Sequence, residues 1–288
     1  MPPLSSPIHR VVVYYQTQYH DQKYISPAPL IPVATHLIIA AIHLNDSGDN
    51  IVTLNNLAPD DSSLNQMWVD VARMQGSGVK VMGMLGGASD GSYKLLNKDF
   101  DKYYAPLSSF ITTYGLDGID LDVEVKSETY DDIVKLIKQL RSDFGTDFLI
   151  TLAPVASALS GGSNLSGFDY TTLEANYGDD INWYNVQFYS GFGSMADTTS
   201  YDSIITYSSL DPSRLVAGTL SSDSGAGWVE LDIVKATVRQ LLRKYGNSFG
   251  GIAAWEYYDS MPDTDEPWTW AAVMKLAMVN WKEVLAAA

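Results

Sequence analysis

The sequence contains no cysteine, only four histidines, and about half as many basic as acidic residues. The absence of cysteine excludes a disulfide framework, a Cys-ligated metal site and a thiol nucleophile. The 18 Lys and Arg residues face 34 Asp and Glu residues, which gives a net charge of −16. Nucleic acids and anionic membrane surfaces bind basic patches, so we expect neither as a partner. This acidity suits an enzyme that acts on neutral substrates.

Long hydrophobic runs are also missing. The longest apolar stretch covers residues 37–44, far short of the ~20 residues that span a membrane. Residues 1–7 lack the apolar segment of a signal peptide, so a cytoplasmic location and secretion after removal of a leader both stay open. At 46% hydrophobic residues, the chain can bury a sizeable core, and we expect a monomer.

Short apolar and β-branched runs recur along the whole chain and alternate with helical patterns. Several runs are apolar on both alternating faces, which is typical of parallel strands covered on both sides. Five connections carry apolar residues at helical spacing, whereas the first, fifth and sixth are expected to be short or irregular. The expected strands are Val11–Gln16, His36–Asn45, Val79–Gly86, Gly118–Glu124, Phe148–Val155, Asn182–Tyr189, Leu215–Leu220 and Gly250–Tyr257, and the expected helices are Leu64–Gln75, Phe100–Tyr114, Tyr130–Phe144, Leu231–Tyr245 and Glu266–Val284.

This order of elements predicts an α/β protein with a single (β/α)₈ TIM barrel over residues 1–288. A doubly wound sheet is the alternative. That fold needs a glycine-rich phosphate-binding turn after its first strand, and no such turn follows Gln16. No linker or low-complexity segment divides the chain.

The most informative segment is Asp117-Gly118-Ile119-Asp120-Leu121-Asp122-Val123-Glu124 on the fourth expected strand. Strand alternation places Asp120, Asp122 and Glu124 on one face and the three aliphatic residues on the other. In a barrel the acids then point inward, with Glu124 at the C-terminal mouth where barrel enzymes carry their chemistry. Carboxyl groups packed this closely raise the pKa of at least one member, which can then protonate a glycosidic oxygen.

Two other chemistries fit this sequence less well. The D-x-D-x-D spacing is similar to a calcium loop but lacks its glycine and distal glutamate, and a glycosyltransferase D-x-D motif would belong to a nucleotide-binding sheet. A serine hydrolase would show a G-x-S-x-G turn, which is absent. We therefore expect no metal and no cofactor, and structural roles for the histidines, which show no metal-ligand spacing: His9, His20, His36 and His43.

The acidic segment resembles the D-x-x-D-x-D-x-E motif of glycoside hydrolase family 18, which contains chitinases and endo-β-N-acetylglucosaminidases. Gln187-Phe188-Tyr189 and Trp255, at the ends of the sixth and eighth expected strands, resemble further family positions. Met84-Leu85-Gly86-Gly87 resembles the family's S-x-G-G, with Met84 in place of the serine. Within the family, residues 79–84, 148–159 and 183–193 are most similar to compact fungal endo-β-N-acetylglucosaminidases.

The resemblance implies a role for each acid. Glu124 would protonate the leaving oxygen and later accept a proton from water. Asp122 would hold the N–H of the substrate's 2-acetamido group, whose carbonyl oxygen acts as the nucleophile, and Asp120 would share a proton or a hydrogen bond with Asp122. Asp117 would support the motif. If the protein itself supplied the nucleophile, Glu256 would be the main candidate, although strand alternation turns it away from Trp255.

The resemblance also implies a set of substrate contacts. Tyr189 would donate its hydroxyl to the acetamido oxygen, and Trp255 would form the floor beneath the sugar. The remaining candidates for substrate binding are Gln187, Asn185, Tyr14 and Asn45, and Gln187 and Asn185 would alternatively contact the acids.

The implied activity is hydrolysis of the β-1,4 bond in the N,N′-diacetylchitobiose core of N-glycans, with high-mannose glycans or glycoproteins as partners. It would proceed with retention of anomeric configuration through an oxazolinium intermediate. A chitinase of the same family is the first alternative, and a non-catalytic lectin or inhibitor is the second. The presence of Glu124 argues against the inactive alternative.

Overall fold

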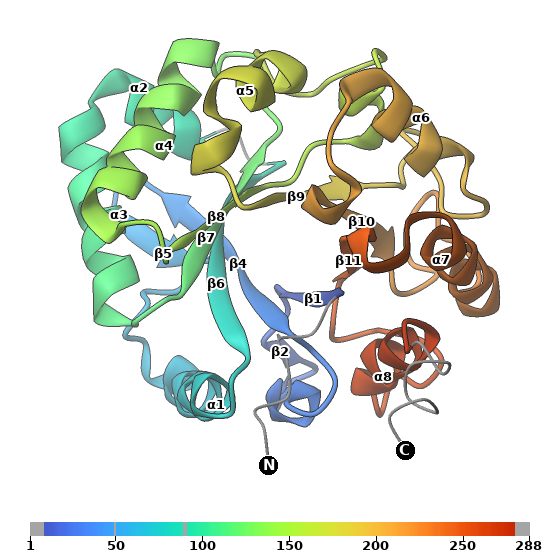
Figure 1. The fold of residues 1–288 in the computed structure, drawn as a ribbon. Helices are drawn as coiled ribbons and strands as arrows, with labels where there is room; N and C mark the ends of the chain where they lie inside the picture. Colours follow the sequence, from blue (N-terminus) through green and yellow to red (C-terminus); the bar gives the residue numbers. More distant parts are fainter. Residues whose placement is uncertain (1–8, 49, 89–90, 280–288) are drawn as a thin grey trace.

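Eight parallel strands close into a barrel in the computed structural model, which describes residues 9–48, 50–88 and 91–279. The barrel order is β1-β4-β6-β7-β8-β9-β10-β11, and β11 pairs with β1 to complete the ring. Helices surround the strands (Figure 1), as a TIM barrel requires. The predicted fold is confirmed. The barrel strands are β1 (Arg10–Tyr15), β4 (His36–Leu44), β6 (Lys80–Gly87), β7 (Gly118–Val123), β8 (Leu149–Leu152), β9 (Trp183–Gln187), β10 (Leu215–Leu220) and β11 (Gly251–Trp255).

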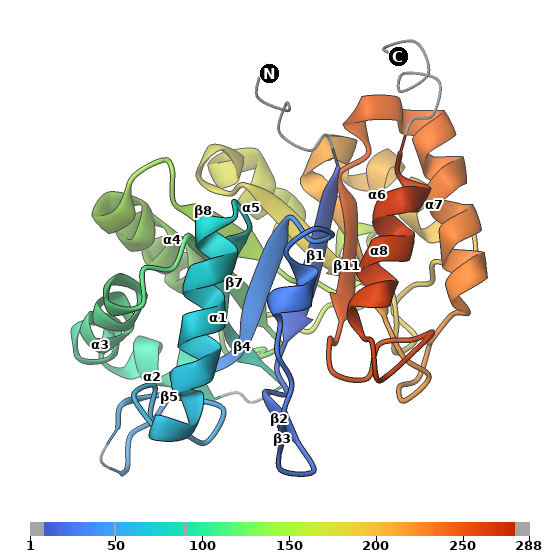
Figure 2. The ribbon, with the colours of Figure 1, turned by 90° about the horizontal axis from the view of Figure 1, so that it is seen from below.

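Three short strands lie outside the barrel order. The hairpin of β2 (Tyr19–His20) and β3 (Lys23–Tyr24) follows β1 and extends from one end of the barrel (Figure 2). The strand β5 (Val52–Leu54) pairs antiparallel with the end of β4. A single 3₁₀ turn, Ala28–Leu30, completes the first connection, which confirms that this crossover is irregular.

Eight helices cover the described part of the barrel. The predicted helix Tyr130–Phe144 forms with those limits, because Thr129 and Asp132 make a reciprocal capping box at its start. The last helix begins only after Pro267 and ends at Ala277, so the expected extension is wrong at Met278 and Val279 and otherwise falls outside the described residues. The helices are α1 (Asn65–Gly76), α2 (Gly91–Lys98), α3 (Phe100–Thr113), α4 (Tyr130–Phe144), α5 (Tyr170–Tyr177), α6 (Thr199–Ser208), α7 (Leu231–Tyr245) and α8 (Trp268–Ala277). None of them is long and apolar enough to cross a membrane.

The barrel has two apolar layers. The outer layer lies between strands and helices and contains Ile119, Leu121 and Val123 of β7. The inner layer fills the barrel with side chains such as Val12, Met82 and Val216, while Asp120 and Asp122 of β7 are also buried. The alternation predicted for the acidic strand is therefore confirmed.

A glycine allows the end of β6 to approach the backbone of β7 closely at Asp122. Gly86 adopts φ +99°, a conformation that residues with a side chain rarely adopt. A Cβ atom at this position would lie 2.4 Å from the carbonyl oxygen of Asp122 and 2.5 Å from the Tyr93 ring. Both the backbone conformation and the available space thus require glycine here.

We predict that Gly86→Ala lowers the free energy of unfolding by about 1–3 kcal/mol, because it adds both backbone strain and overpacking. The matched control is Gly76→Ala at the end of α1, where no atom lies within 4 Å of the added Cβ. Urea unfolding followed by circular dichroism measures both variants. Equal stability of the two variants would contradict the close packing at Gly86.

Candidate active site

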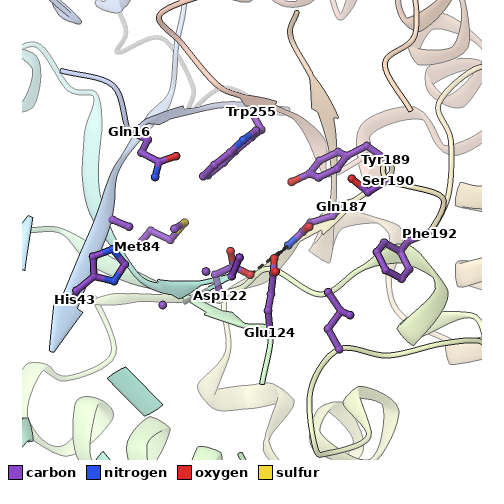
Figure 3. Close-up of a pocket in the computed structure, with 15 residues that line it drawn as sticks. Gln16, His43, Met84, Asp122, Glu124, Gln187, Tyr189, Ser190, Phe192 and Trp255 are labelled. Atoms are coloured by element: carbon purple, nitrogen blue, oxygen red, sulfur yellow. Dashed lines mark hydrogen bonds between the residues drawn. The ribbon is translucent and has the colours of Figure 1, made fainter. Parts of the chain in front are cut away.

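A cavity of about 410 Å³ opens at the C-terminal ends of the barrel strands. Residues from the ends of β1, β4, β6, β7, β9 and β11 line it. Asp122 and Glu124 line one side of it, with Trp255 and Tyr189 across from them (Figure 3). The predicted carboxylates, the tyrosine and the tryptophan therefore meet in one cavity, at the barrel face where (β/α)₈ enzymes place their chemistry.

One amide links the two acids of the cavity. Gln187 Nε2 donates to Asp122 Oδ1 and to Glu124 Oε1, both at 3.2 Å, and to the Ala153 carbonyl oxygen at 2.9 Å. Burial raises the pKa of Asp122 well above its usual range, and the neighbouring carboxyls of Glu124 and Asp120 raise it further. A hydrogen bond to Glu124 also favours the protonated form of Asp122. The raised pKa of Asp122 thus favours a proton held beside Glu124.

Asp120 lies deeper in the barrel and is completely buried. Its carboxyl group accepts hydrogen bonds from the Tyr14 hydroxyl at 2.7 Å, from Asn185 Nδ2 at 2.9 Å and from the Thr151 hydroxyl. Burial raises the pKa of Asp120, and these three donors counteract that effect. Asp122 is hydrogen-bonded to Glu124, and the expected sharing of a proton or hydrogen bond between Asp120 and Asp122 stays a prediction.

Three of the predicted substrate contacts lie away from the open cavity. The hydroxyl of Tyr14 is used by Asp120, and Asn185 is held between Asp120 and the Trp183 indole, whose Nε1 donates to Asn185 Oδ1 at 2.8 Å. Both side chains are buried and hold Asp120 in place. For Asn185, contact with an acid was one of the two expected alternatives. Asn45 donates to the Thr53 hydroxyl at 3.1 Å and to the Ile51 carbonyl, next to β5, so its side chain serves the local hairpin.

Tyr189 and Trp255 present complementary groups to the cavity. Burial raises the pKa of Tyr189 far above its usual value, and the charges of Asp122 and Glu124 raise it further, so its hydroxyl remains a donor. Trp255 offers an indole face whose centroid lies 5.4 Å from that of Tyr14. A donor hydroxyl, an aromatic face and an acid pair together match the polar and apolar faces of an acetamido sugar.

His43 was expected to be structural, yet it lines the cavity beside Met84 (Figure 3). Strict alternation along β4 puts His43 on the face opposite His36. The pairing of β4 with β6 shifts register between Ile39 and Ile42, so that Ala40 and Ala41 both join the inner layer. This irregularity turns His43 inward. Burial lowers the pKa of His43, which favours the neutral imidazole.

Other lining residues were also absent from the expected set. Gln16 follows Tyr14 by two residues, so the alternation of the first strand already indicated that it faces inward. Ser190 and Phe192 belong to the loop after β9, and Leu165 belongs to the loop after β8. Strand patterns carry no signal for where such loop residues lie.

Glu256 does not point into the cavity. Its carboxylate accepts hydrogen bonds from the backbone of Gln16 and from the backbone and hydroxyl of Thr17. Among the residues that the structure describes, Asp122 and Glu124 are the acids that line the cavity. Over the same ranges, no three His, Asp or Glu side chains are arranged to hold a metal ion. The site can donate and accept a proton and bind an amide, while Glu256 is not placed to attack a bound sugar.

Asp117 occupies the opposite end of β7. It accepts hydrogen bonds from Lys80 Nζ at 2.8 Å, from the backbone N–H of Val81 at 2.9 Å and from Gln75 Nε2 at 3.0 Å. These donors lower its pKa against the opposing effect of burial. Asp117 therefore joins α1, β6 and β7, in agreement with the supporting role expected for it.

We predict that Gln187→Met shifts the alkaline limb of the pH–activity profile upward by about one pH unit. The lost N–H donor stabilises ionised carboxylates, so its removal raises the pKa of Asp122 and preserves the proton to higher pH. A hydrogen bond to a charged group contributes about as much as the 1.4 kcal/mol that one pKa unit represents. The pH dependence of kcat/KM measures the shift.

The matched control for this prediction is Gln75→Met, which removes the amide bonded to Asp117 at the far end of the barrel. That variant should keep the wild-type profile. A downward shift for Gln187→Met, or an equal shift in both variants, would contradict the assigned role of the Gln187 amide.

Comparison with known proteins identifies one family. The model of "Glycosyl hydrolases family 18" matches residues 10–249. Chitinase 1 of Tulipa saxatilis subsp. bakeri is 27% identical over 266 residues, which cover 86% of this chain and 80% of the relative. Chitinase 2 of Rhizopus oligosporus is 28% identical over 65% of this chain, and the matched region spans only 35% of that relative's length.

Two solved structures are similar over nearly the whole chain. A fungal endo-beta-N-acetylglucosaminidase from glycosyl hydrolase family 18 is 44% identical with a TM-score of 0.88, covering 94% of this chain and 98% of the other. The chitinase ChiC from Aspergillus fumigatus is 43% identical with a TM-score of 0.83, covering 94% and 100%. These neighbours carry two different substrate names on nearly the same backbone.

Proposed function

The chain belongs to glycosyl hydrolase family 18, and we propose that it hydrolyses the β-1,4 bond of the N,N′-diacetylchitobiose core of N-glycans. One observation carries the proposed mechanism: the cavity holds Asp122 and Glu124 side by side, facing a tyrosine hydroxyl and an indole, while Glu256 is bound elsewhere. Such a site needs a substrate that brings its own nucleophile, and a 2-acetamido sugar does so. The high similarity to a fungal endo-beta-N-acetylglucosaminidase supports the choice of substrate.

In the proposed first step, the sugar lies on the Trp255 indole with its acetamido group between Asp122 and Tyr189. Asp122 passes its proton to Glu124, so that its carboxylate accepts a hydrogen bond from the acetamido N–H while Tyr189 donates its hydroxyl to the carbonyl oxygen. The carbonyl oxygen then attacks the anomeric carbon while the glycosidic bond breaks and the leaving oxygen takes a proton from Glu124. The positive charge of the resulting oxazolinium ring develops next to Asp122, which stabilises it.

In the second step, Glu124 acts as a base. It removes a proton from a water molecule, which attacks the anomeric carbon and breaks the bond to the acetamido oxygen. The neutral acetamide is regenerated, and Glu124 recovers its proton. Two successive inversions at one carbon give net retention. Asp120 stays out of contact with the substrate and keeps Asp122 in position through the shared strand.

A chitinase is the second candidate, because ChiC has almost the same identity to this chain and the curated relatives are named chitinases. Both substrates place N-acetylglucosamine at the bond to be cleaved, so the central acid site fits either one. The walls beyond it, including His43 and Gln16 on one side and Phe192 on the other, must distinguish them.

We predict release of an intact high-mannose glycan from a glycoprotein, with one N-acetylglucosamine left on the protein. Mass spectrometry after parallel incubation with ribonuclease B and with chitin oligomers measures both activities. Chitin oligomers should be cleaved far more slowly. The Glu124→Gln variant is the control. Its activity should be lower by about 10²–10⁴-fold on either substrate, since glutamine has no transferable proton. Rapid chitin cleavage without glycan release would establish the chitinase instead.

We predict that Asp122→Asn separates the two steps of the mechanism. Hydrolysis should fall sharply, because the carboxylate that stabilises the oxazolinium charge is gone. Transfer from a preformed glycan oxazoline onto an N-acetylglucosamine acceptor should persist, since that donor has passed the first step and Glu124 can still activate the acceptor. Chromatography of the transfer product measures this, and equal loss of hydrolysis and transfer would contradict the assignment.

A further inference from the structure

Glu256 uses its carboxylate on the backbone of another strand end. Its Oε2 accepts hydrogen bonds from the backbone N–H of Gln16 at 3.0 Å and of Thr17 at 2.8 Å, and its Oε1 accepts from the Thr17 hydroxyl at 2.8 Å. Gln16 and Thr17 follow β1 directly, whereas Glu256 follows Trp255 at the end of β11. One side chain therefore joins the ends of the two strands that close the barrel.

Further hydrogen bonds fix the segment around Glu256 on both sides. The backbone carbonyl of Glu256 accepts from the Ser221 hydroxyl at 2.6 Å and from the Ser260 hydroxyl at 2.9 Å, and the backbone N–H of Ser221 donates to the Trp255 carbonyl at 2.9 Å. The N–H of Tyr257 donates to the Tyr14 carbonyl at 3.0 Å. The segment is thus tied to β1 on one side and to the end of β10 on the other.

The two residues next to this contact both face the cavity. Trp255 precedes Glu256 in the chain and forms one wall, and Gln16 projects its amide from the adjacent strand end (Figure 3). A sugar lying on the indole would therefore be bordered by a side chain whose backbone position depends on Glu256. Two consecutive backbone N–H groups aimed at one oxygen also form the kind of concave site that favours an anion.

We propose that Glu256 is a positioning residue, which sets the distance between Gln16 and Trp255 across the sugar-binding wall. It does not touch the substrate, so its effect passes through these two neighbours. A misplacement of about 1 Å in such a wall can cost about 10²-fold in catalytic efficiency. This inference concerns a residue outside the acid pair and holds for either proposed substrate.

The structure predicts that glutamine can replace Glu256 and that alanine cannot. In Glu256→Gln, the amide oxygen can accept from the Gln16 and Thr17 N–H groups while the amide N–H donates to the Thr17 hydroxyl oxygen. In Glu256→Ala, the two backbone N–H groups lose their acceptor. A nucleophilic Glu256 would behave differently, because glutamine cannot form the glycosyl ester and its loss typically costs about 10⁴-fold or more.

The experiment compares kcat and KM of Glu256→Ala and Glu256→Gln on whichever substrate the wild type cleaves faster. Isothermal titration with an N-acetylglucosamine thiazoline, a stable mimic of the oxazolinium intermediate, provides a binding readout. We expect Glu256→Ala to raise KM and to weaken thiazoline binding, with kcat/KM lower by about 10²-fold, whereas Glu256→Gln should keep values close to those of the wild type. Thermal melts of each variant distinguish misplacement from unfolding.

Thr17 supplies a second, independent pair of variants. Thr17→Ser keeps the hydroxyl that donates to Glu256, and Thr17→Val removes it with little change in shape, so only valine should weaken thiazoline binding. If Glu256→Gln abolishes activity as completely as Glu256→Ala, or if Glu256→Ala leaves KM and thiazoline binding unchanged, the positioning role is overturned. If the wild type cleaves chitin oligomers faster than the glycan, only the proposed substrate specificity is overturned, because the Glu256 variants are compared on either substrate.

Discussion

Two carboxyl groups buried on one strand, Asp120 and Asp122, impose the constraint on which the rest of the site depends. A carboxylate inside a barrel is costly unless donors or a proton compensate for the lost water. Asp120 is compensated by Tyr14, Thr151 and Asn185, which come from three other strands. Asp122 is compensated by a raised pKa, which favours its neutral form, and by the Gln187 amide. The barrel interior is therefore organised around the acids of β7.

The different hydrogen-bond partners of the acids explain the different roles that we assign to them. Asp120 has three hydrogen-bond donors and does not line the cavity, and as a fixed neighbour it adds to the effects of burial and of Glu124, which raise the pKa of Asp122. Asp122 and Glu124 face the open cavity and share a single amide donor, so both are placed to exchange a proton with a bound substrate. The end of β6 approaches the backbone of Asp122 closely at Gly86, where no side chain fits. A general acid results from the surroundings of the residue as much as from its type.

The sequence was sufficient to predict the barrel and the inward face of the acids, because both follow from the strand alternation that an apolar core requires. It was sufficient for Tyr189 and Trp255 through resemblance alone, since an isolated aromatic residue on a strand carries no sign of function. The sequence mispredicted the position of His43, because a register shift in β4 turns this side chain toward the barrel interior and cannot be recognised in the apolar pattern. It was also misleading for Asn45, whose amide is bound by the short β5 hairpin.

The prediction of helices from the sequence succeeded and failed for similar reasons. Long helices with an apolar stripe, such as α4 and α7, were predicted within a residue of their bounds, whereas α2, α5 and α6 were not predicted. These three have only 8 to 10 residues and bury two or three side chains each, so tertiary packing rather than local periodicity holds them in place. The role of Glu256 was equally invisible, because its partners lie 239 and 240 residues away in the chain.

The central claim is that the substrate's acetamido oxygen, and not a protein carboxylate, attacks the anomeric carbon. The most direct test measures kcat/KM on aryl glycosides whose reacting sugar carries N-acetyl, N-fluoroacetyl, N-difluoroacetyl or N-trifluoroacetyl groups. Successive fluorines withdraw electrons from the carbonyl oxygen with little change in size. The account predicts a steep, progressive fall in rate along this series. Equal rates for all four substrates would contradict it and would point to a nucleophile supplied by the protein.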